Sequence, residues 1–549
     1  MDSIRKILRL SLAGATFAAL PLMAGDSKMN VVQMFEKECQ GCHGPNHEGG
    51  VGSSLDPKAI GKKGDYFLRD TILNGRAGTA MPSFKSKFTS DDADKMVQYL
   101  LKYEAKQLTK LTMEDVAATH QILEDREELY KKYPKPTDVK SVQDIVIFTE
   151  RDASKVGFID GTTNKVLSKH SSGFATHVTV VNKRIPRYVY NISRDGWVNM
   201  FDLNAPGQPM IAKIRVGSDS RGLACTPDGR YLMAGNYVPG GAVLLDAMTL
   251  KPLKIYATDQ VEDMDGKIGS SRVASIADTP YGPYIAFALK DAGHVYIVDY
   301  SKPDFPIVGD IPKIGKILHD AFLNEGEEVG RYYMIASQGS DVMGIVDFKT
   351  KTLADKVYTG PGSKPHPGQG SSWYNEKLGK QLHATVNMNV GDVTIWDNQW
   401  HVLKHTKTAG GGLFIGTNEH TPFLWADNVI GGEDNYNKVH LVNKETLMVG
   451  RIIQATKEGM VQLIDPNTLK VIKEWNVGAV KNEKGELITP RLLHGEPAAH
   501  GEHEYISDWT CGRILVFNAK TGEYITQITG LTTPTFTYSI EHRMDLPGA

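Results

Sequence analysis

The sequence predicts a small all-α domain followed by an all-β eight-bladed propeller. Three observations lead to this fold class: a length of 549 residues, helical periodicity near the N-terminus, and a strand-like phrase that recurs along the rest of the chain. A chain of this length exceeds one ordinary hydrophobic core. We therefore expect residues 1–24 to form an export signal, 25–104 the helical domain, 105–144 a linker and 145–549 the propeller.

The helical domain is predicted from three segments with helical periodicity. These are Val31–Glu38, a segment at 66–73, and Ser90–Lys102, in which Ala93, Met96 and Leu100 share one apolar face. A charged, helix-prone connector follows and ends at a Pro-rich stop at 131–136.

The propeller is predicted from a short apolar phrase that ends in Asp or Asn. Most copies are spaced by about 42 to 53 residues, the period of a four-stranded blade. One interval, 443 to 465, is only about half a blade, so we merge those two copies and expect eight blades. A β-sandwich would not keep this spacing over so long a segment. The copies lie at 156–160, 198–202, 243–246, 295–299, 344–347, 393–397, 439–443, 461–465 and 514–518.

Composition and charge exclude several functional classes. The hydrophobic fraction of 41% and the charged fraction of 23% are typical of globular proteins. A net charge of -2 provides no basic surface for nucleic acid and no polybasic membrane patch.

The N-terminus predicts export. Arg5, Lys6 and Arg9 precede an apolar run at 10–23, with Ala24 at a cleavage position. No later run approaches the roughly 18 to 20 apolar residues that span a bilayer. We expect a periplasmic protein without stable membrane insertion; a retained N-terminal anchor is the alternative.

The segment Cys39-Gln40-Gly41-Cys42-His43 predicts covalent haem c. Two thiols in this spacing bond to the haem, and the adjoining His43 ligates its iron. A zinc site would need a second Cys or His pair nearby, and a redox dithiol would need a βαβ context. Met81, on a Pro-punctuated loop, is the expected sixth ligand. His47 is its rival, but it follows His43 too closely to reach the opposite face.

Two cysteines remain outside the motif. Cys225 and Cys511 would be able to pair in an oxidising compartment, but the sparse cysteine content favours buried free thiols.

Three histidines of the propeller segment lie in suggestive settings: His177 in Phe-Ala-Thr-His-Val, His319 in Leu-His-Asp and His366 in Lys-Pro-His-Pro-Gly. Together with the haem c motif, the Met-Pro pair at 81–82 and the eight blades, they resemble the cytochrome cd1 nitrite reductase family, which includes a related haem d1 maturation dehydrogenase. The resemblance covers essentially the whole mature chain. It implies that His177 ligates the iron of haem d1 and that His319 and His366 stand over the open iron face.

The resemblance also implies residues that bind the carboxylates of haem d1. Guanidinium groups suit carboxylates because they donate two parallel hydrogen bonds. The residues at the corresponding positions are Arg151, Arg194, Arg221, Tyr237 and Arg272.

The main functional expectation is reduction of nitrite to nitric oxide at haem d1, with the electron delivered through haem c. His319 and His366 would supply the two protons, since histidine titrates near neutral pH. The resemblance further implies a small c-type cytochrome or a cupredoxin as electron donor, and a homodimer.

Some features depart from the reductases. Gln369 stands where they often have an Arg, and the short arm before the haem c motif has no tyrosine. The stretches 235–239 and 271–273 are closer to the haem d1 assembly relatives. The alternatives are therefore a dihydro-haem d1 dehydrogenase and a non-catalytic haem d1-binding protein. A further cluster, His494, His500 and His503, fits no standard metal-ligand spacing and favours a polar rim loop.

Overall fold

The computed structural model describes residues 30–43, 47, 55, 57–76, 81–103, 111–482, 485–498 and 500–547. The predicted export signal lies outside these residues. In the part of the chain that is described, no helix is both long enough and apolar enough to cross a membrane.

The N-terminal region is helical, as predicted. Its helices are α1 (Val31–Glu38), α2 (Gln40–His43), α3 (Pro57–Ile60), a 3-10 turn (Gly61–Lys63), α4 (Asp65–Asn74) and α5 (Ser90–Lys102). Capping boxes fix the starts of α1 and α5: Asn30 and Gln33 exchange hydrogen bonds at one, Thr89 and Asp92 at the other. Ala93 and Met96 of α5 are fully buried in the core of this region, which confirms the predicted apolar face.

The connector contains α6 (Met113–Ala118), β1 (Gln121–Ile122) and α7 (Arg126–Lys132). Strand β1 pairs with β8 of the propeller, and Val116 of α6 is buried in the core between two blades. The connector is thus packed against the propeller.

The rest of the described chain forms the eight sheets of a propeller, together with a small hairpin of β13 (Val261–Glu262) and β14 (Ile268–Gly269). From the innermost to the outermost strand, the sheets are β37 (Pro534–Ser539), β2 (Ile145–Glu150), β3 (Lys155–Asp160), β4 (Lys165–Ser171); β5 (Thr176–Val181), β6 (Tyr188–Ser193), β7 (Trp197–Asp202), β8 (Met210–Arg215); β9 (Asp219–Cys225), β10 (Tyr231–Val238), β11 (Gly241–Asp246), β12 (Pro252–Ala257); β15 (Val273–Asp278), β16 (Tyr284–Leu289), β17 (His294–Asp299), β18 (Ile307–Ile311); β19 (Leu318–Leu323), β20 (Tyr332–Ser337), β21 (Val342–Asp347), β22 (Thr352–Tyr358); β23 (Ser371–Asn375), β24 (Lys380–Val386), β25 (Asp392–Asp397), β26 (Val402–Lys407); β27 (Ile415–Gly416), β28 (Phe423–Asp427), β29 (Lys438–Asn443), β30 (Val449–Ala455), β31 (Met460–Ile464), β32 (Val471–Asn476); and β33 (Leu492–Ala498), β34 (His503–Asp508), β35 (Arg513–Asn518), β36 (Tyr524–Ile528).

Eight copies of the recurring phrase mark the third strands of the eight blades, and the ninth, at 461–465, marks β31, the fifth strand of the six-stranded sheet. In all nine copies, the terminal Asp or Asn accepts a hydrogen bond of 2.8–3.1 Å from the backbone N–H two residues later, as Asp160 does from Thr162. This local turn ends the strand and starts the return to the next one. The copies at 439–443 and 461–465 fall in one six-stranded sheet, so the merged unit and the total of eight blades are confirmed.

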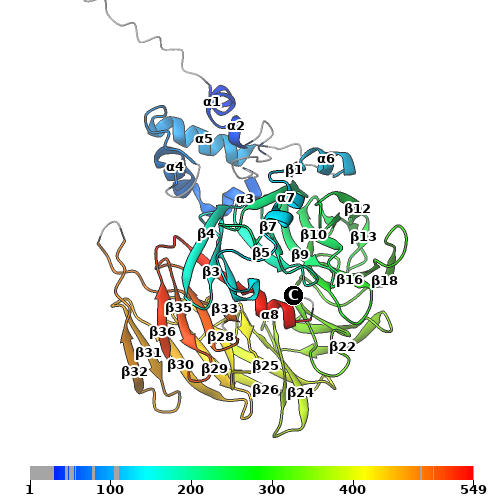
Figure 1. The fold of residues 1–549 in the computed structure, drawn as a ribbon, viewed down its shortest axis with the longest axis vertical. Helices are drawn as coiled ribbons and strands as arrows, with labels where there is room; N and C mark the ends of the chain where they lie inside the picture. Colours follow the sequence, from blue (N-terminus) through cyan, green and yellow to red (C-terminus); the bar gives the residue numbers. More distant parts are fainter. Residues whose placement is uncertain are drawn as a thin grey trace, which may run out of the picture.

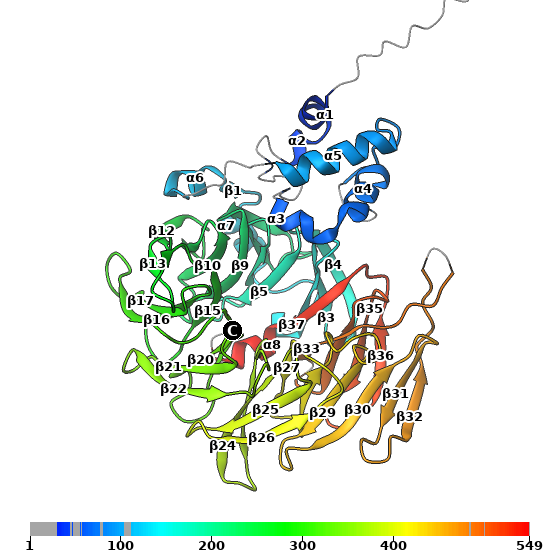
Figure 2. The same cartoon turned by 180° about the vertical axis from the view of Figure 1, so that it is seen from behind.

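The ring closes because the last strand of the chain joins the first blade. Strand β37 pairs antiparallel with β2, from Ser539 opposite Val146 to Pro534 opposite Glu150. Helix α8 (Ile540–Asp545) follows at once and lies inside the ring of blades in both views (Figures 1 and 2). The N-terminal helices form a separate group beside the ring, with α3 near β4 (Figures 1 and 2).

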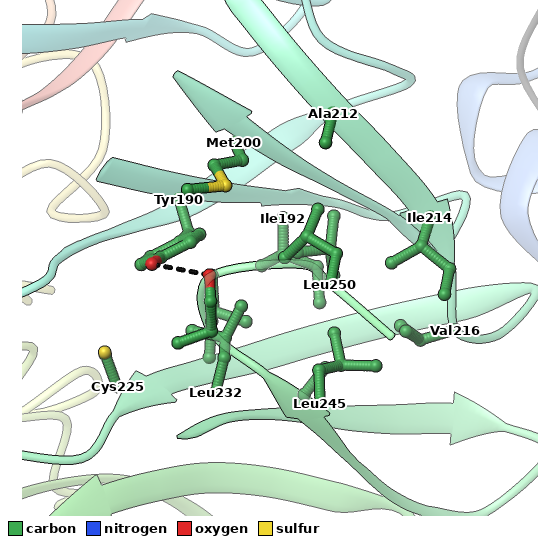
Figure 3. Packing of buried hydrophobic residues seen from close by; sticks show 14 of the residues in the cluster. Tyr190, Ile192, Met200, Ala212, Ile214, Val216, Cys225, Leu232, Leu245 and Leu250 are labelled. Carbon is green, nitrogen blue, oxygen red and sulfur yellow. Dashed lines mark hydrogen bonds between the residues drawn. The ribbon is translucent and has the colours of Figure 1, made fainter. Parts of the chain in front are cut away.

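Neighbouring blades are held together by apolar side chains between their sheets. Figure 3 shows one such core, in which Tyr190 donates a 2.8 Å hydrogen bond to the carbonyl of Ala247. Cys225 is buried in this core, and both Cys225 and Cys511 are free thiols, as expected. The expectation that both are buried holds for Cys225 but not for Cys511, which is half-buried.

Candidate functional site

A cavity of about 400 Å³ lies within the ring, lined mainly by the inner strands of the blades, by loops at the ends of the inner and second strands, and by the C-terminal segment. Five residues predicted from the sequence line it: Arg151, His177, Arg221, His319 and His366. Their positions span several blades, so the closed ring is what brings them together.

A repeated irregularity of the inner strands aims side chains into this cavity. In five blades, two residues of the inner strand stand opposite one residue of the second strand, which is the geometry of a β-bulge. The bulged pairs include His177-Val178 of β5, Arg221-Gly222 of β9 and His319-Asp320 of β19. Three of the predicted residues therefore reach the cavity from equivalent positions in their blades.

His319 and His366 lie side by side, with ring centroids 4.7 Å apart. Asp320 sits between them. One of its carboxylate oxygens is 3.0 Å from His319 Nδ1, and the other is 3.3 Å from His366 Nε2. Arg221 contacts the same carboxylate at 3.0 Å, and the Nδ1 of His366 lies 2.7 Å from the carbonyl oxygen of Leu413.

His177 has the environment expected of an iron ligand. Its backbone carbonyl accepts a 2.6 Å hydrogen bond from the hydroxyl of Tyr538, while its own buried Nδ1 has no hydrogen-bond partner in the described part of the chain. Burial, together with the guanidinium groups of Arg221 and Arg151, holds the pKa of His177 well below its ordinary value. The neutral imidazole is the form that ligates metals.

The cationic residues divide into two groups. Arg151 and Arg221 line the cavity, where they are placed to bind carboxylates. Arg194 and Arg272 lie outside its lining and flank the ring of Tyr237, with guanidinium carbons 4.7 and 5.2 Å from its centroid.

Each of these two outer arginines also pairs with a carboxylate: Arg194 with Asp219 at 2.6 Å, and Arg272 with Asp291 at 2.5 Å. The structure therefore groups Arg194, Tyr237 and Arg272 beside the cavity. Their predicted contacts with haem d1 remain predictions.

Gln369 also lines the cavity and contacts a buried carboxylate. Its amide donates to Glu496, which accepts further hydrogen bonds from Arg543 Nε at 2.6 Å and from the backbone N–H of Ser539 at 2.8 Å. Arg543 in turn stacks over Tyr538, 5.0 Å from the ring centroid. The C-terminal helix is thereby joined to the cavity wall.

Several cavity residues were not predicted from the sequence. Asp320, Trp509, Tyr538 and Arg543 are the clearest cases. Asp320 was visible as the neighbour of His319, but alternation along a regular strand would place it on the opposite face. The others lie far along the chain, and only ring closure brings them to the site.

The haem c motif lies at the junction of α1 and α2. Cys39 caps the C-terminus of α1, while Cys42 and His43 belong to α2, with Cys42 exposed and His43 buried. Met81 is half-buried, and its carbonyl accepts a 3.1 Å hydrogen bond from the backbone of Arg76. Gly75 permits this approach, because at its φ of 70° a Cβ would stand 2.8 Å from the Met81 carbonyl oxygen.

His47 packs among aromatic rings of the same region. It stacks on Tyr103 with centroids 3.5 Å apart and also contacts Phe35. Burial, together with His43, lowers the pKa of His47 to about 4. The assignments of Met81 as sixth ligand and of His47 as a packing residue stay predictions.

The cluster of C-terminal histidines does not converge on one point. His494 is buried and pairs with Glu504 at 3.1 Å, whereas His500 is exposed and pairs with Glu541 at 2.7 Å. Among the described residues, the group that could hold a metal ion is instead His319, Asp320 and His366, whose ligand atoms lie within 4.8 Å of one another.

The helical domain touches the propeller beside the cavity. Arg76 donates to the backbone carbonyl of Asp152, and Lys63 lies 3.5 Å from its carboxylate. The same carboxylate accepts a 3.1 Å hydrogen bond from the indole of Trp509, which lines the cavity, as does Arg151 next to Asp152. The contact between the two domains is therefore one residue away from the cavity wall.

Comparisons with known proteins agree with this architecture. The cytochrome D1 heme domain family matches residues 140–543, and the family of cytochrome c oxidase, cbb3-type, subunit III matches residues 28–100. The chain is 29% identical to a nitrite reductase of Stutzerimonas stutzeri over 455 residues, 77% of this chain and 79% of that protein. It is 27% identical to the dihydro-heme d1 dehydrogenase of Pseudomonas aeruginosa over 447 residues, 81% and 86% of the two chains.

A solved structure shares the fold: that of a dihydro-heme d1 dehydrogenase in complex with DHE, with a TM-score of 0.76 and 23% identity over 94% of this chain and 100% of that chain. The residues present fit the groups that such domains bind. The Cys-x-x-Cys-His motif suits haem c, and the unpartnered His177 Nδ1, with two arginines in the same cavity, suits haem d1. The chain, an oxidoreductase that binds haem c and haem d1, belongs to the cytochrome D1 heme domain family.

Proposed function

We propose that this protein is an exported, periplasmic enzyme that oxidises dihydro-haem d1 to haem d1. The proposal rests on the chemistry of the cavity wall at Gln369. Where the reductases often have a cationic Arg, this chain has a neutral amide that is committed to the carboxylate of Glu496. The cation at this part of the wall, Arg543, is itself paired with Glu496, so a small inorganic anion meets no unpaired cation there.

The residues have distinct tasks in this reaction. His177 holds the iron of the macrocycle, and Arg151 and Arg221 bind its carboxylates. Oxidation removes two protons and two electrons from the dihydro substrate. Cys39 and Cys42 would bind haem c and His43 and Met81 would ligate its iron; the haem would then supply a one-electron acceptor. The adjacent rings of His319 and His366 form the group through which the protons leave the substrate.

The remaining partners follow from the same proposal. A small c-type cytochrome or cupredoxin takes the electrons from haem c, and the protein works as a homodimer. Arg194, Tyr237 and Arg272 support the carboxylate-binding side of the cavity.

Nitrite reduction is the second candidate, because His319 and His366 are both present and adjacent, as two proton donors to nitrite would be. One experiment separates the two functions. The purified protein is mixed with dihydro-haem d1 and an oxidised acceptor, and separately with reduced donor and nitrite, while spectra and nitric oxide are recorded.

The proposal expects conversion of the dihydro form, reduction of haem c and no nitric oxide. Firmly held haem d1 with nitric oxide release would establish the reductase instead. Binding of the macrocycle without either reaction would make the protein a haem d1 carrier. His366→Ala is expected to abolish turnover and to leave the haem c spectrum unchanged. The control is His401→Ala, at an exposed histidine outside the cavity, which should retain turnover.

A further inference from the structure

Asp320 owes its place in the cavity to the bulge of β19. Leu318 pairs with Ser337 and Ala321 with Ile335, so His319 and Asp320 together stand opposite one residue. In a regular strand these neighbours would face opposite sides of the sheet. The bulge lets both side chains line the cavity.

The carboxylate of Asp320 is ionised and can only accept hydrogen bonds. Burial alone would raise its pKa, but His319, Arg221 and His366 hold that pKa well below its ordinary value. Other groups that face it are Lys290, whose pKa is lowered to about 7 by burial and by Arg221, and the buried hydroxyls of Tyr333 and Tyr538.

The hydrogen-bond partners of the two histidines differ. His366 faces an oxygen atom at each nitrogen: the carbonyl of Leu413 lies 2.7 Å from Nδ1 in a hydrogen bond, and the carboxylate of Asp320 lies 3.3 Å from Nε2 in an ion-pair contact. Both contacts are satisfied only if both nitrogens carry protons. Burial, together with Arg221, lowers the pKa of His366 and opposes this charge, whereas the carboxylate of Asp320 and the carbonyl of Leu413 favour it. His319 turns Nδ1 towards the carboxylate of Asp320 at 3.0 Å, and a guanidinium nitrogen of Arg221 lies 3.5 Å from the same Nδ1. The nearer carboxylate favours a proton on Nδ1, because 3.5 Å is too long for a strong hydrogen bond from the guanidinium. The Nε2 of His319 has no hydrogen-bond partner among the described residues.

We propose that Asp320 is a positioning residue that gives the two histidines unequal roles. It holds the proton of His319 on Nδ1, which leaves Nε2 as the proton acceptor, and it keeps His366 as the doubly protonated, charged ring. The proposal rests on the proposed function.

Loss of two hydrogens from the substrate breaks two bonds to hydrogen and forms one double bond, so two protons and two electrons leave. His319 Nε2 takes the protons in turn and passes them to solvent. The haem c that Cys39, Cys42 and His43 would hold would pass the two electrons one at a time to the external acceptor.

Nuclear magnetic resonance of the full-length protein labelled with 15N-histidine tests the proton positions. His319→Gln and His366→Gln assign the two sets of signals. At pH 7 we expect His319 to be protonated at Nδ1 alone and His366 at both nitrogens.

Asp320→Asn should shift both sets of signals. Asp347→Asn, which breaks an arginine pair of 2.7 Å in the same blade but outside the cavity lining, should shift neither. A His319 proton on Nε2, or unchanged signals in Asp320→Asn, would overturn the proposal.

Turnover provides a second readout. Asp320→Asn is expected to lower the rate of dihydro-haem d1 oxidation at saturating substrate at least tenfold and to change the dissociation constant of the macrocycle less than twofold. Asp320→Glu should recover part of the rate. Full turnover in Asp320→Asn would contradict the positioning role. A joint loss of macrocycle binding and rate would also contradict it, because that is the effect expected of a purely structural aspartate.

The two proposals fail separately. The proton positions are measured without substrate, so a protein that does not oxidise dihydro-haem d1 could still show them. Calorimetric titration with Zn²⁺ tests the alternative that His319, Asp320 and His366 form a metal site. The guanidinium of Arg221 opposes a second cation, so we expect no binding there. Zn²⁺ binding that is lost in Asp320→Asn would reassign the three side chains as a metal site.

Discussion

The helical domain and the propeller assemble their sites in different ways. The haem c motif is contiguous: Cys39, Cys42 and His43 fall within the end of one helix and the next short one. The cavity of the propeller is lined by residues from Thr149 to Pro547, which belong to most of the blades. One site depends on local spacing, and the other depends on closure of the whole ring.

This difference predicts different sensitivities. A contiguous motif keeps its geometry as long as its own helices form. A cavity built across blades changes when the ring that holds it loosens, even through residues remote from the chemistry.

The largest expected effect is removal of haem c by Cys39→Ala combined with Cys42→Ala. The covalent bonds run through these two thiols, so haem staining of a denaturing gel should vanish. The urea midpoint of the propeller should stay unchanged, because its blades do not include the motif. Cys511→Ala, at a half-buried free thiol of the propeller, is the control and should keep the stain. Staining that persists in the double variant would refute the attachment.

Phe536→Ala tests the opposite case, in which the ring is disturbed. Phe536 lies on the closing strand β37, is 5% exposed, and packs on Phe414 and Tyr538 with centroids 4.5 and 4.8 Å away. Truncation of a buried Phe costs about 3 to 5 kcal/mol. We expect that loss in the free energy of unfolding of the propeller by urea, with normal haem c attachment. Because Phe536 also lines the cavity, macrocycle binding should weaken as well.

Tyr358→Ala serves as its control, because Tyr358 is exposed and removal of a surface side chain changes stability by about 0.5 kcal/mol or less. Equal effects of the two substitutions would show that the closing strand has no special part in stability.

The propeller architecture could be predicted because it repeats. Each copy of the phrase carries its own strand and its own Asp or Asn turn, so nine local signals agree, and even the irregular blade is visible as a half-length interval. The haem c motif could also be predicted, because the residues that bind haem c lie within five positions of the sequence.

The cavity could be predicted only in part. His177, His319 and His366 were found through the family resemblance, but Asp320 was not, because its access to the cavity depends on the bulge of β19. A bulge is set by hydrogen-bond register between strands, which one sequence does not reveal. Trp509 and Arg543 were missed because only ring closure brings them near residues such as Arg151.

The smallest expected effect concerns a carboxyl group of the cavity wall. Burial raises the pKa of Glu325 from 4.5 to about 7, and Lys444 only partly opposes this shift. Between about pH 4.5 and 7, Glu325 is therefore protonated in the folded state but ionised in the unfolded chain. The stability that this bound proton contributes is lost as the pH rises through about 7. Glu325→Gln removes the titration. From pH 5 to pH 8 its free energy of unfolding in urea should improve relative to the parent protein by about 1 to 3 kcal/mol.

Glu327→Gln, two residues away at an exposed position, should show no such gain. If the Glu325→Gln variant follows the parent at both pH values, Glu325 is solvated in the folded protein. The wall of the cavity at this point would then be open to water.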